Sequence, residues 1–255
     1  MINGLRNHCR TAIADLRYQG LPVVLWKILA KLVRPVAKLE FYILFEFDLT
    51  QPIGEQAARI DAEYRIELAT EADIVSIIDI QIGAPRPLPA ESLSDAQEYQ
   101  RAEVARLRSS AHADLLQTMR AGEICFLFRV GNELVHCNWM RFSSCAHVPH
   151  RPVELASDEV YMTDGYTAER WRGRGVHGVV MAHMFRYARD HGFKRAWGVT
   201  EITKAASRRG VRRVGWRQRG RLLYVTPRVL ERTWLLRLGG DVEPMLRRAV
   251  REAEG

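Results

Sequence analysis

The segment from residue 170 to 193, RWRGRGVHGVVMAHMFRYARDHGF, has the residue types and the spacing of an anion-binding turn. Three arginines stand among two glycines, and a run with helical spacing follows directly. The N-terminus of a helix has unpaired backbone N–H groups and partial positive charge, so it attracts phosphate. The alternative interpretation is a helix cap beside a solvated basic patch.

The charge and composition of the chain favour anionic partners without choosing among them. The 255 residues carry a net charge of +8 at pH 7, and 47% of them are hydrophobic, which allows a substantial core. The four cysteines form no CxxC pair and have no histidine at zinc-finger spacing. We therefore expect no metal, no disulfide framework and a reducing, cytoplasmic setting. No stretch of the sequence is long and apolar enough to span a bilayer.

The first 60 residues differ in pattern from the rest of the chain. The stretch LPVVLWKILAKLVRPVAKLE predicts a basic amphipathic helix, broken or kinked near Pro35. Its cations and the apolar positions opposite them are Lys27, Lys31, Arg34 and Lys38, and Val24, Ile28, Leu32 and Val36. Next, FYILFEFDL alternates like a half-buried strand with Glu46 and Asp48 on its solvent side. We expect residues 1–60 to form a helix and strand extension and residues 61–255 to form the main domain.

The amphipathic helix has two possible uses. It can hold the protein on the inner, cytoplasmic face of an anionic membrane, through its cations and apolar side chains together. It can instead pack its apolar face on the main domain, or on a second subunit in a homodimer. Only the membrane contact depends on lipid and weakens as salt rises.

From residue 64 onward, the patterns predict the order strand, helix, helix, strands, helix, strand, helix, strands. Thr70 and Asp73 have the spacing of a helix cap before EADIVSIIDIQI, and residues 94–120 form a second helical region. The run ICFLFRV, the turn GN and ELVHCNWMRF predict a hairpin. The segments that follow are the strand EVYMTDGYT, the turn and its helix, the strand RAWGVT, the basic helix KAASRRGVRRV, and the strands RLLYVT and ERTWLLRL.

This order of elements and its basic turn resemble the GNAT superfamily of acyl-CoA-dependent N-acyltransferases, over about residues 64 to 226. In that family a turn of pattern [RQ]-x-x-G-x-[GA] follows the fourth strand and binds the CoA pyrophosphate. RGRGVH fits with Arg172, Gly175 and His177, and the overlapping RWRGRG fits with Arg170. We favour the first register, because the helix then ends at HGF.

A second segment, VTEITKAASRRGVRRVGW, resembles the other CoA-binding region of the family. Ser207 matches the usual serine, Lys204 replaces an asparagine, and Gly215–Trp216 replaces Gly-Phe. The resemblance implies an α/β (α+β) fold: a mixed, mostly antiparallel sheet flanked by helices, with splayed fourth and fifth strands. It also implies acetyl-CoA as acyl donor, with these contact residues: Thr167, Arg172, Gly173, Arg174, Gly175, Val176, His177, Gly178 and Ser207.

The activity implied by the resemblance is direct attack of a neutral amine on a thioester, which needs a base. The candidate bases are Glu159 and Asp164, which alternation places on opposite faces of the strand, so at most one reaches the amine. Either carboxylate can instead serve in an ion pair or a turn cap. In many members a tyrosine protonates the leaving thiolate. Val211 stands at that position here, and Tyr166 or Tyr224 could serve as the proton donor instead.

The resemblance leaves the acceptor and the alternatives open. The N-terminal pattern resembles extensions of bacterial members associated with envelope or surface-polysaccharide biosynthesis, which implies an amino sugar or an envelope precursor as the small amine acceptor. The missing tyrosine keeps a second hypothesis open, a GNAT-fold module that binds acyl-CoA without efficient catalysis. Nucleic-acid binding through SRRGVRRVGWRQRGR is not expected, because the run lacks a pair of stacking aromatics.

Overall fold

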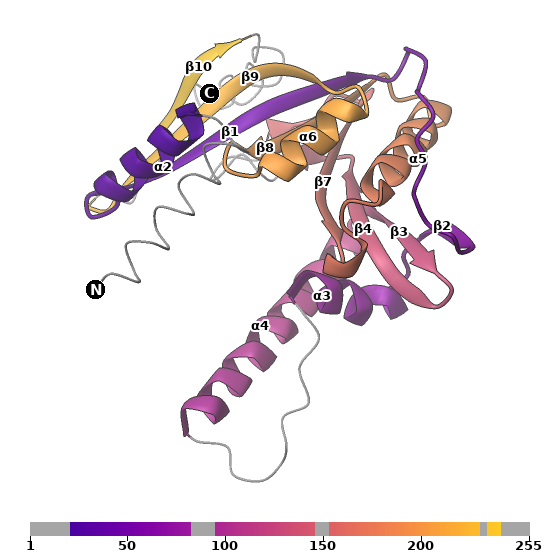
Figure 1. The fold of residues 1–255 in the computed structure, drawn as a ribbon, viewed down its shortest axis with the longest axis horizontal. Helices are drawn as coiled ribbons and strands as arrows, with labels where there is room; N and C mark the ends of the chain where they lie inside the picture. The colour runs from indigo at the N-terminus through magenta and orange to yellow at the C-terminus, as the bar shows by residue number, and fades with distance from the viewer. Residues whose placement is uncertain (1–20, 83–94, 146–152, 230–233, 241–255) are drawn as a thin grey trace. The chain divides into compact units, whose positions relative to one another are not determined.

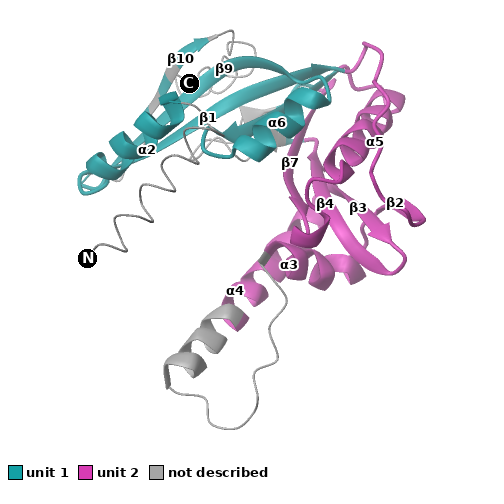
Figure 2. Cartoon of the chain, in the orientation of Figure 1, with its two compact units in different colours: residues 1–48, 143–156, 195–255 teal, residues 49–142, 157–194 magenta. Residues whose placement is uncertain are grey.

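The chain divides into two compact units (Figures 1 and 2). The computed structural model describes residues 21–82, 95–145, 153–229 and 234–240. Unit 1 comprises residues 1–48, 143–156 and 195–255, and unit 2 comprises residues 49–142 and 157–194. Each unit is built from segments that are far apart in the sequence. The expected division near residue 60 stays a prediction.

Unit 1 is built around the long strand β1 (Ala37–Asp48), which has a hydrogen-bonded neighbour on each edge. Within this unit the strand order is β10-β9-β1-β8, and all of these pairs are antiparallel. The other elements of unit 1 are α2 (Leu21–Val33), β5 (Ser144–Cys145), β6 (Val153–Glu154), β8 (Arg195–Glu201), α6 (Ala205–Arg213), β9 (Arg217–Pro227) and β10 (Trp234–Gly240).

The side chains on both faces of β1 are buried. Leu44 and Phe45, which are neighbours in the strand and point to opposite faces, are 0% and 1% exposed. The prediction of a solvent side is therefore wrong at Glu46, which is 7% exposed. Glu46 forms an ion pair with Arg219 of β9, and this partner allows a charged group to stay in the interior.

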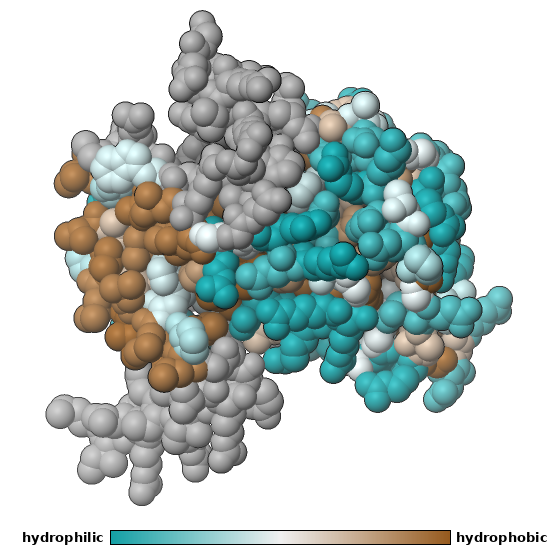
Figure 3. All heavy atoms as spheres, turned by 90° about the horizontal axis from the view of Figure 1, so that it is seen from above, coloured by the Kyte–Doolittle hydropathy of each residue, from teal (hydrophilic) through white to brown (hydrophobic). Residues whose placement is uncertain are grey.

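Helix α2 ends just before Pro35, as the sequence predicts. The prediction that its cations share one helical face is wrong for Arg34 and Lys38, because both lie beyond the helix and Lys38 belongs to β1. On its inner side α2 packs against β1, with the Trp26 and Phe41 ring centroids 5.2 Å apart. Figure 3 shows apolar residues gathered at the side of the view where α2 and β10 lie.

Unit 2 has an antiparallel sheet in the order β7-β4-β3-β2, with a helix on each face. Cys125 and Leu127 of β3 pack with Ile77 of α3, whereas the Phe126 ring lies 5.2 Å from that of Tyr187 in α5. Because alternate strand residues point to opposite faces, α3 and α5 cover opposite faces of the sheet.

The elements of unit 2 follow the predicted order. They are β2 (Tyr64–Leu68), η1 (Glu71–Asp73), α3 (Ile74–Ile82), α4 (Asp95–Arg120), β3 (Ile124–Val130), β4 (Glu133–Arg141), β7 (Glu159–Thr167), η2 (Glu169–Trp171) and α5 (Val176–Asp190). Together the two units confirm the predicted fold class, mixed α/β with mostly antiparallel strands flanked by helices. The splay of the fourth and fifth strands stays a prediction. Among the described residues, no helix is long and apolar enough to cross a membrane.

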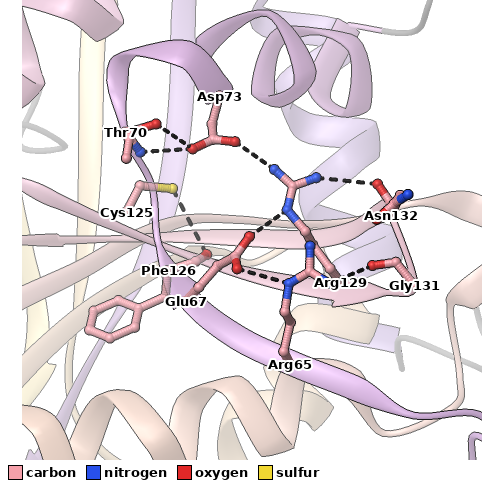
Figure 4. A network of polar contacts seen from close by, with 9 residues as sticks. All are labelled: Arg65, Glu67, Thr70, Asp73, Cys125, Phe126, Arg129, Gly131 and Asn132. Carbon is pink, nitrogen blue, oxygen red and sulfur yellow. Dashed lines mark hydrogen bonds and ion pairs between the residues drawn. The ribbon is translucent and has the colours of Figure 1, made fainter.

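The start of the first helix of unit 2 is tied to the sheet by Arg129 (Figure 4). The predicted cap is present, since the Thr70 N–H and hydroxyl both donate to Asp73, at 2.8 and 2.9 Å. Arg129, whose side chain is 11% exposed, lies 2.6 Å from Glu67 and 2.6 Å from Asp73. Burial by itself would raise the pKa of Glu67, but hydrogen bonds from Arg129 and Arg65 outweigh it and lower that pKa.

Replacing Arg129 should cost far more stability than replacing an exposed arginine of the same unit. We expect Arg129→Met to lower the free energy of unfolding by about 2–3 kcal/mol, because the partly buried Asp73 loses its ion-pair partner and Glu67 keeps only Arg65. The matched variant Arg120→Met removes the ion pair with Glu71, in which both side chains are more than half exposed, and should cost about 0.5 kcal/mol or less. Urea denaturation measures both changes, and equal costs would show that Arg129 has no special role.

Candidate functional site

The turn between β7 and α5 presents a row of free backbone N–H groups. Gly173 and Gly175 have φ values of +78° and +86°, a conformation that glycine adopts without strain. The first hydrogen bonds of α5 run from the N–H groups of Gly178 and Val179 to the Gly175 carbonyl, at 3.0 and 3.2 Å. The N–H groups of residues 173–177 donate to no backbone carbonyl of a described residue. Such a row of N–H groups at the start of a helix is the arrangement that binds anions in other proteins.

The carbonyl side of the same turn is held by the linker that follows β1. The Arg59 N–H donates to the Arg174 carbonyl at 2.7 Å, and the Arg59 Nη2 donates to the Gly173 carbonyl at 2.6 Å. In a trans peptide the C=O and the next N–H point in opposite directions. The N–H groups of Arg174 and Gly175 therefore point away from Arg59. The sequence carries no signal for this clamp, because Arg59 lies in a linker without a motif.

The three arginines of the turn have different surroundings. Arg170 Nε donates to Glu133 at 2.9 Å, so its charge is neutralised. Arg172 is anchored to β7, donating to the Thr167 carbonyl and to the Tyr166 hydroxyl, each at 3.1 Å. Arg174 lies over the Trp171 ring, 4.9 Å from its centroid. Helix α5 begins at Val176, and the choice of the register with Arg172, Gly175 and His177 stays a prediction.

Just before the turn, β7 bulges opposite Asn138. The pairing with β4 runs from Cys137↔Tyr166 to Trp139↔Thr163, so Asp164 and Gly165 together face one residue. Asp164 has φ +53°, the left-handed conformation that bulges and functional sites often hold. A Cβ at Gly165 would lie 3.2 Å from the Asn138 amide nitrogen, so a larger residue there would press on the Asn138 side chain.

The structure separates the two candidate bases. Asp164 lies exposed at the bulge, and its carboxylate is 3.6 Å from Arg141 Nη2. Glu159 is 1% exposed at the opposite end of β7. The alternation argument did not include this bulge. The bulge interrupts the regular alternation of side chains between the two faces of β7. Asp164 is therefore the carboxylate that a solvent-borne amine can reach.

Of the two tyrosines that could replace the missing general acid, Tyr166 lies near Asp164. It is half-buried on β7, two residues beyond the bulge, and its hydroxyl accepts the hydrogen bond from Arg172. Tyr224 belongs to β9 of unit 1 and is 1% exposed. Val211 lies in α6, where it offers no hydroxyl.

Two histidines, one in β4 and one at the start of α5, contact each other near the end of β7. His136 Nδ1 is 2.7 Å from the Thr167 hydroxyl, and its ring centroid is 5.5 Å from that of His177. Burial, followed by the neighbouring His177, lowers the pKa of His136 well below its usual value. Burial lowers the pKa of His177 to about 4. Thr167 is thus held by its side chain to His136 and by its carbonyl to Arg172.

The second predicted CoA segment lies in unit 1. The Ser207 hydroxyl of α6 is 3.4 Å from that of Thr200, and Lys204 is the N-cap residue of the helix. Gly215 has φ +92°, and a Cβ there would lie 3.1 Å from the Phe47 ring. The Gly215–Trp216 pair therefore lets the chain pass close to β1. Among the described residues, no group of three or more His, Cys, Asp or Glu side chains is arranged to hold a metal.

No protein-family model and no curated protein matches the sequence. Similar solved structures include a functionally unknown conserved protein from Staphylococcus epidermidis, at 12% identity and a TM-score of 0.48, covering 78% of this chain and 66% of that one. A GNAT-family acetyltransferase from Colwellia psychrerythraea has 12% identity and a TM-score of 0.48, over 75% of this chain and 56% of that one. A GCN5-related N-acetyltransferase from Kribbella flavida has 13% identity and a TM-score of 0.43, over 89% and 66%. The chain thus spans less than two thirds of these proteins, the similarities are weak, and no residue role follows from them.

The two turn glycines should differ in their tolerance of a methyl group. Both have left-handed φ values, but a Cβ at Gly173 meets nothing within 4 Å, whereas one at Gly175 would lie 2.6 Å from the Ala57 carbonyl oxygen. We expect Gly173→Ala to cost about 1 kcal/mol of stability and Gly175→Ala about 3 kcal/mol. Equal losses in thermal or urea unfolding would show that the linker does not press on the turn.

The lowered pKa values of His136 and His177 should make the protein acid-sensitive. Their pKa values are lower in the folded state than in the unfolded chain, so folding favours the neutral rings. This contribution is fully present above about pH 6.5 and is lost as the pH falls toward about 4, with a slope near 1.4 kcal/mol per pH unit for each proton taken up. His177→Gln should flatten this slope, whereas His112→Gln, at an exposed position of α4, should leave it unchanged. An unchanged slope in the His177 variant would contradict the assignment.

Proposed function

We propose that the protein is an N-acyltransferase that transfers acetyl from acetyl-CoA to a primary amine. The observation that carries the proposal is the row of N–H groups at residues 173–177, placed one short turn beyond an exposed carboxylate at the β7 bulge. A pyrophosphate fits the first feature, because the α5 N-terminus, the free N–H groups and Arg174 are all positive. An amine fits the second feature, because Asp164 can take a proton from it.

In this proposal the turn binds the cosubstrate and β7 performs the chemistry. The acceptor ammonium gives a proton to Asp164, and its nitrogen then forms a bond to the thioester carbonyl carbon. The C–S bond breaks, and the thiolate takes a proton from Tyr166 or from water. Two protons leave the acceptor nitrogen in all, of which one ends on the CoA thiol and one in solvent. Arg141 Nη2, 3.6 Å from the Asp164 carboxylate, forms an ion pair with it that holds it at the bulge.

The acceptor that we propose is an amino sugar or an envelope precursor, met at the inner face of a bacterial membrane in the cytoplasm. This part rests on the pattern of the N-terminal extension. A second candidate function is an acyl-CoA-binding module without efficient catalysis, which Val211 favours because it removes the usual proton donor. Release of free thiol from acetyl-CoA, assayed with a panel of amines, separates the two functions.

Arg59 should tune the affinity for CoA although it faces the opposite side of the turn. We expect Arg59→Ala to weaken CoA binding about 5- to 10-fold, because the Gly173 carbonyl loses its guanidinium donor and the N–H of the same peptide loses its fixed direction, whereas the main-chain bond to Arg174 remains. Arg65→Ala is the matched control, since Arg65 also donates to a turn carbonyl, that of Gly131. Calorimetric titration with CoA measures both, and equal affinities would exclude a positioning role for Arg59.

Asp164→Asn should slow acetyl transfer and leave CoA binding unchanged. The change keeps the shape of the side chain, and asparagine tolerates the left-handed φ of this position. We expect the chemical step to slow by about 10²–10⁴-fold, with CoA affinity unchanged. Glu159→Gln, at the buried end of β7, should affect stability more than rate. A pre-steady-state rate near that of the wild type in Asp164→Asn, with loss of rate in Glu159→Gln, would reverse the assignment.

A further inference from the structure

Helix α2 leaves an apolar face exposed. Its members, here called the leucine face, are between 48% and 73% exposed, and they are Leu21, Leu25, Ile28, Leu29 and Leu32. Their spacing of four, three, one and three residues places them on one side of the helix. The other side is occupied, since Val23 is 3% exposed and Trp26 packs on Phe41. The helix therefore has two apolar faces, and only one of them is used for packing on β1.

The apolar surface continues beyond the helix within unit 1. Val36 and Val229 are 65% and 88% exposed. The Arg228 N–H donates to the Val36 carbonyl at 2.9 Å, which brings the two loops together. Trp234, Leu236 and Leu238 alternate along β10, and each is 44–48% exposed. This is the apolar area at the side of Figure 3 where α2 and β10 lie.

Three cations, Arg34, Lys38 and Arg228, line a pocket between the end of α2 and strands β1 and β9. Its volume is about 600 Å³, and it is lined by Ala30, Arg34, Ala37, Lys38, Leu39, Thr226, Pro227 and Arg228. Arg34 and Arg228 are joined, because Arg228 Nε donates to the Arg34 carbonyl at 2.8 Å. Lys38 has an acidic neighbour, Glu40, at 3.0 Å. The helix itself contains no acidic residue and carries two lysines.

We propose that unit 1 docks on an anionic phospholipid membrane, with the leucine face in the acyl boundary and the cations at the flank and end of α2 near the head-group phosphates. The pairing of an exposed apolar helix face with cations at its flank and end is that of an interfacial helix. Charge selects lipid over a second copy of the chain. The helix carries two lysines and no acidic residue, so a second copy of it offers these lysines no partner, whereas an anionic membrane does. This inference does not depend on the proposed acyltransferase activity.

The test is co-flotation of the full chain with vesicles. Phosphatidylcholine vesicles that contain phosphatidylglycerol should carry the protein upward at about 0.1 M salt, and pure phosphatidylcholine vesicles should not. Each cation near an anionic surface contributes about fivefold in partitioning. Binding should therefore fall at least about tenfold in the double variant Arg34→Ser, Arg228→Ser and at about 1 M salt. Arg120→Ser with Arg189→Ser, two exposed arginines of unit 2, is the charge-matched control and should float like the wild type.

The apolar part of the surface has its own matched pair of variants. Leu25→Asp with Leu29→Asp should abolish flotation, because two charges would enter the acyl boundary. Val75→Asp with Leu107→Asp changes two apolar residues of similar exposure in helices of unit 2 and should not.

The proposal is overturned if the full chain stays at the bottom of the gradient with anionic vesicles at low salt. It is also overturned if the Leu25, Leu29 variant floats as the wild type does. A third contrary outcome is that the wild-type chain is a dimer that does not bind vesicles, and that the Leu25, Leu29 variant is a monomer. The leucine face would then be a contact between two copies. If the leucine variant proves unfolded by circular dichroism, the Arg34, Arg228 variant and the salt dependence still decide.

Discussion

The candidate site depends on two left-handed glycines held in place from behind by a linker. A turn with positive φ at Gly173 and Gly175 directs a row of N–H groups outward only if its carbonyls are satisfied on the other side. Arg59 satisfies them with its main chain and its guanidinium at once. The Ala57 carbonyl approaches so closely that only hydrogen fits at Gly175. The candidate anion site therefore depends on Arg59 and Ala57, which contact the opposite side of the turn from its N–H groups.

Strand β7 links this turn to the chemistry that we propose. Its bulge turns Asp164 to solvent, and its last residues, Tyr166 and Thr167, are both tied to Arg172. His136 contacts Thr167 and His177, and the pKa values of both histidines are lowered. Both rings are therefore neutral, and the positive charges near the turn are those of its arginines. In our proposal the β7 bulge takes part in proton transfer, and the turn that follows the strand binds the anion.

Helix α2 of unit 1 has two apolar sides, one packed on β1 and one exposed. An amphipathic helix usually buries its apolar side and exposes a polar one. In α2 the side that packs on β1 is narrow, and a second row of leucines remains exposed beside cations. The helix is therefore part of the fold and, in our proposal, also part of a membrane contact. The two uses that its sequence suggests are compatible, because they involve different faces.

The sequence by itself determined the order of elements, the cap at Thr70, the helix end before Pro35 and the glycine turn, because each follows from local periodicity or backbone preference. Only the tertiary structure decided which charges are buried and which side chains meet. Glu46 is interior because Arg219 comes from a distant strand, and Asp164 is singled out by a bulge set by pairing with β4. Arg59 lies over a hundred residues before the turn that it clamps. Such contacts depend on how distant segments pair, and local sequence patterns do not encode that pairing.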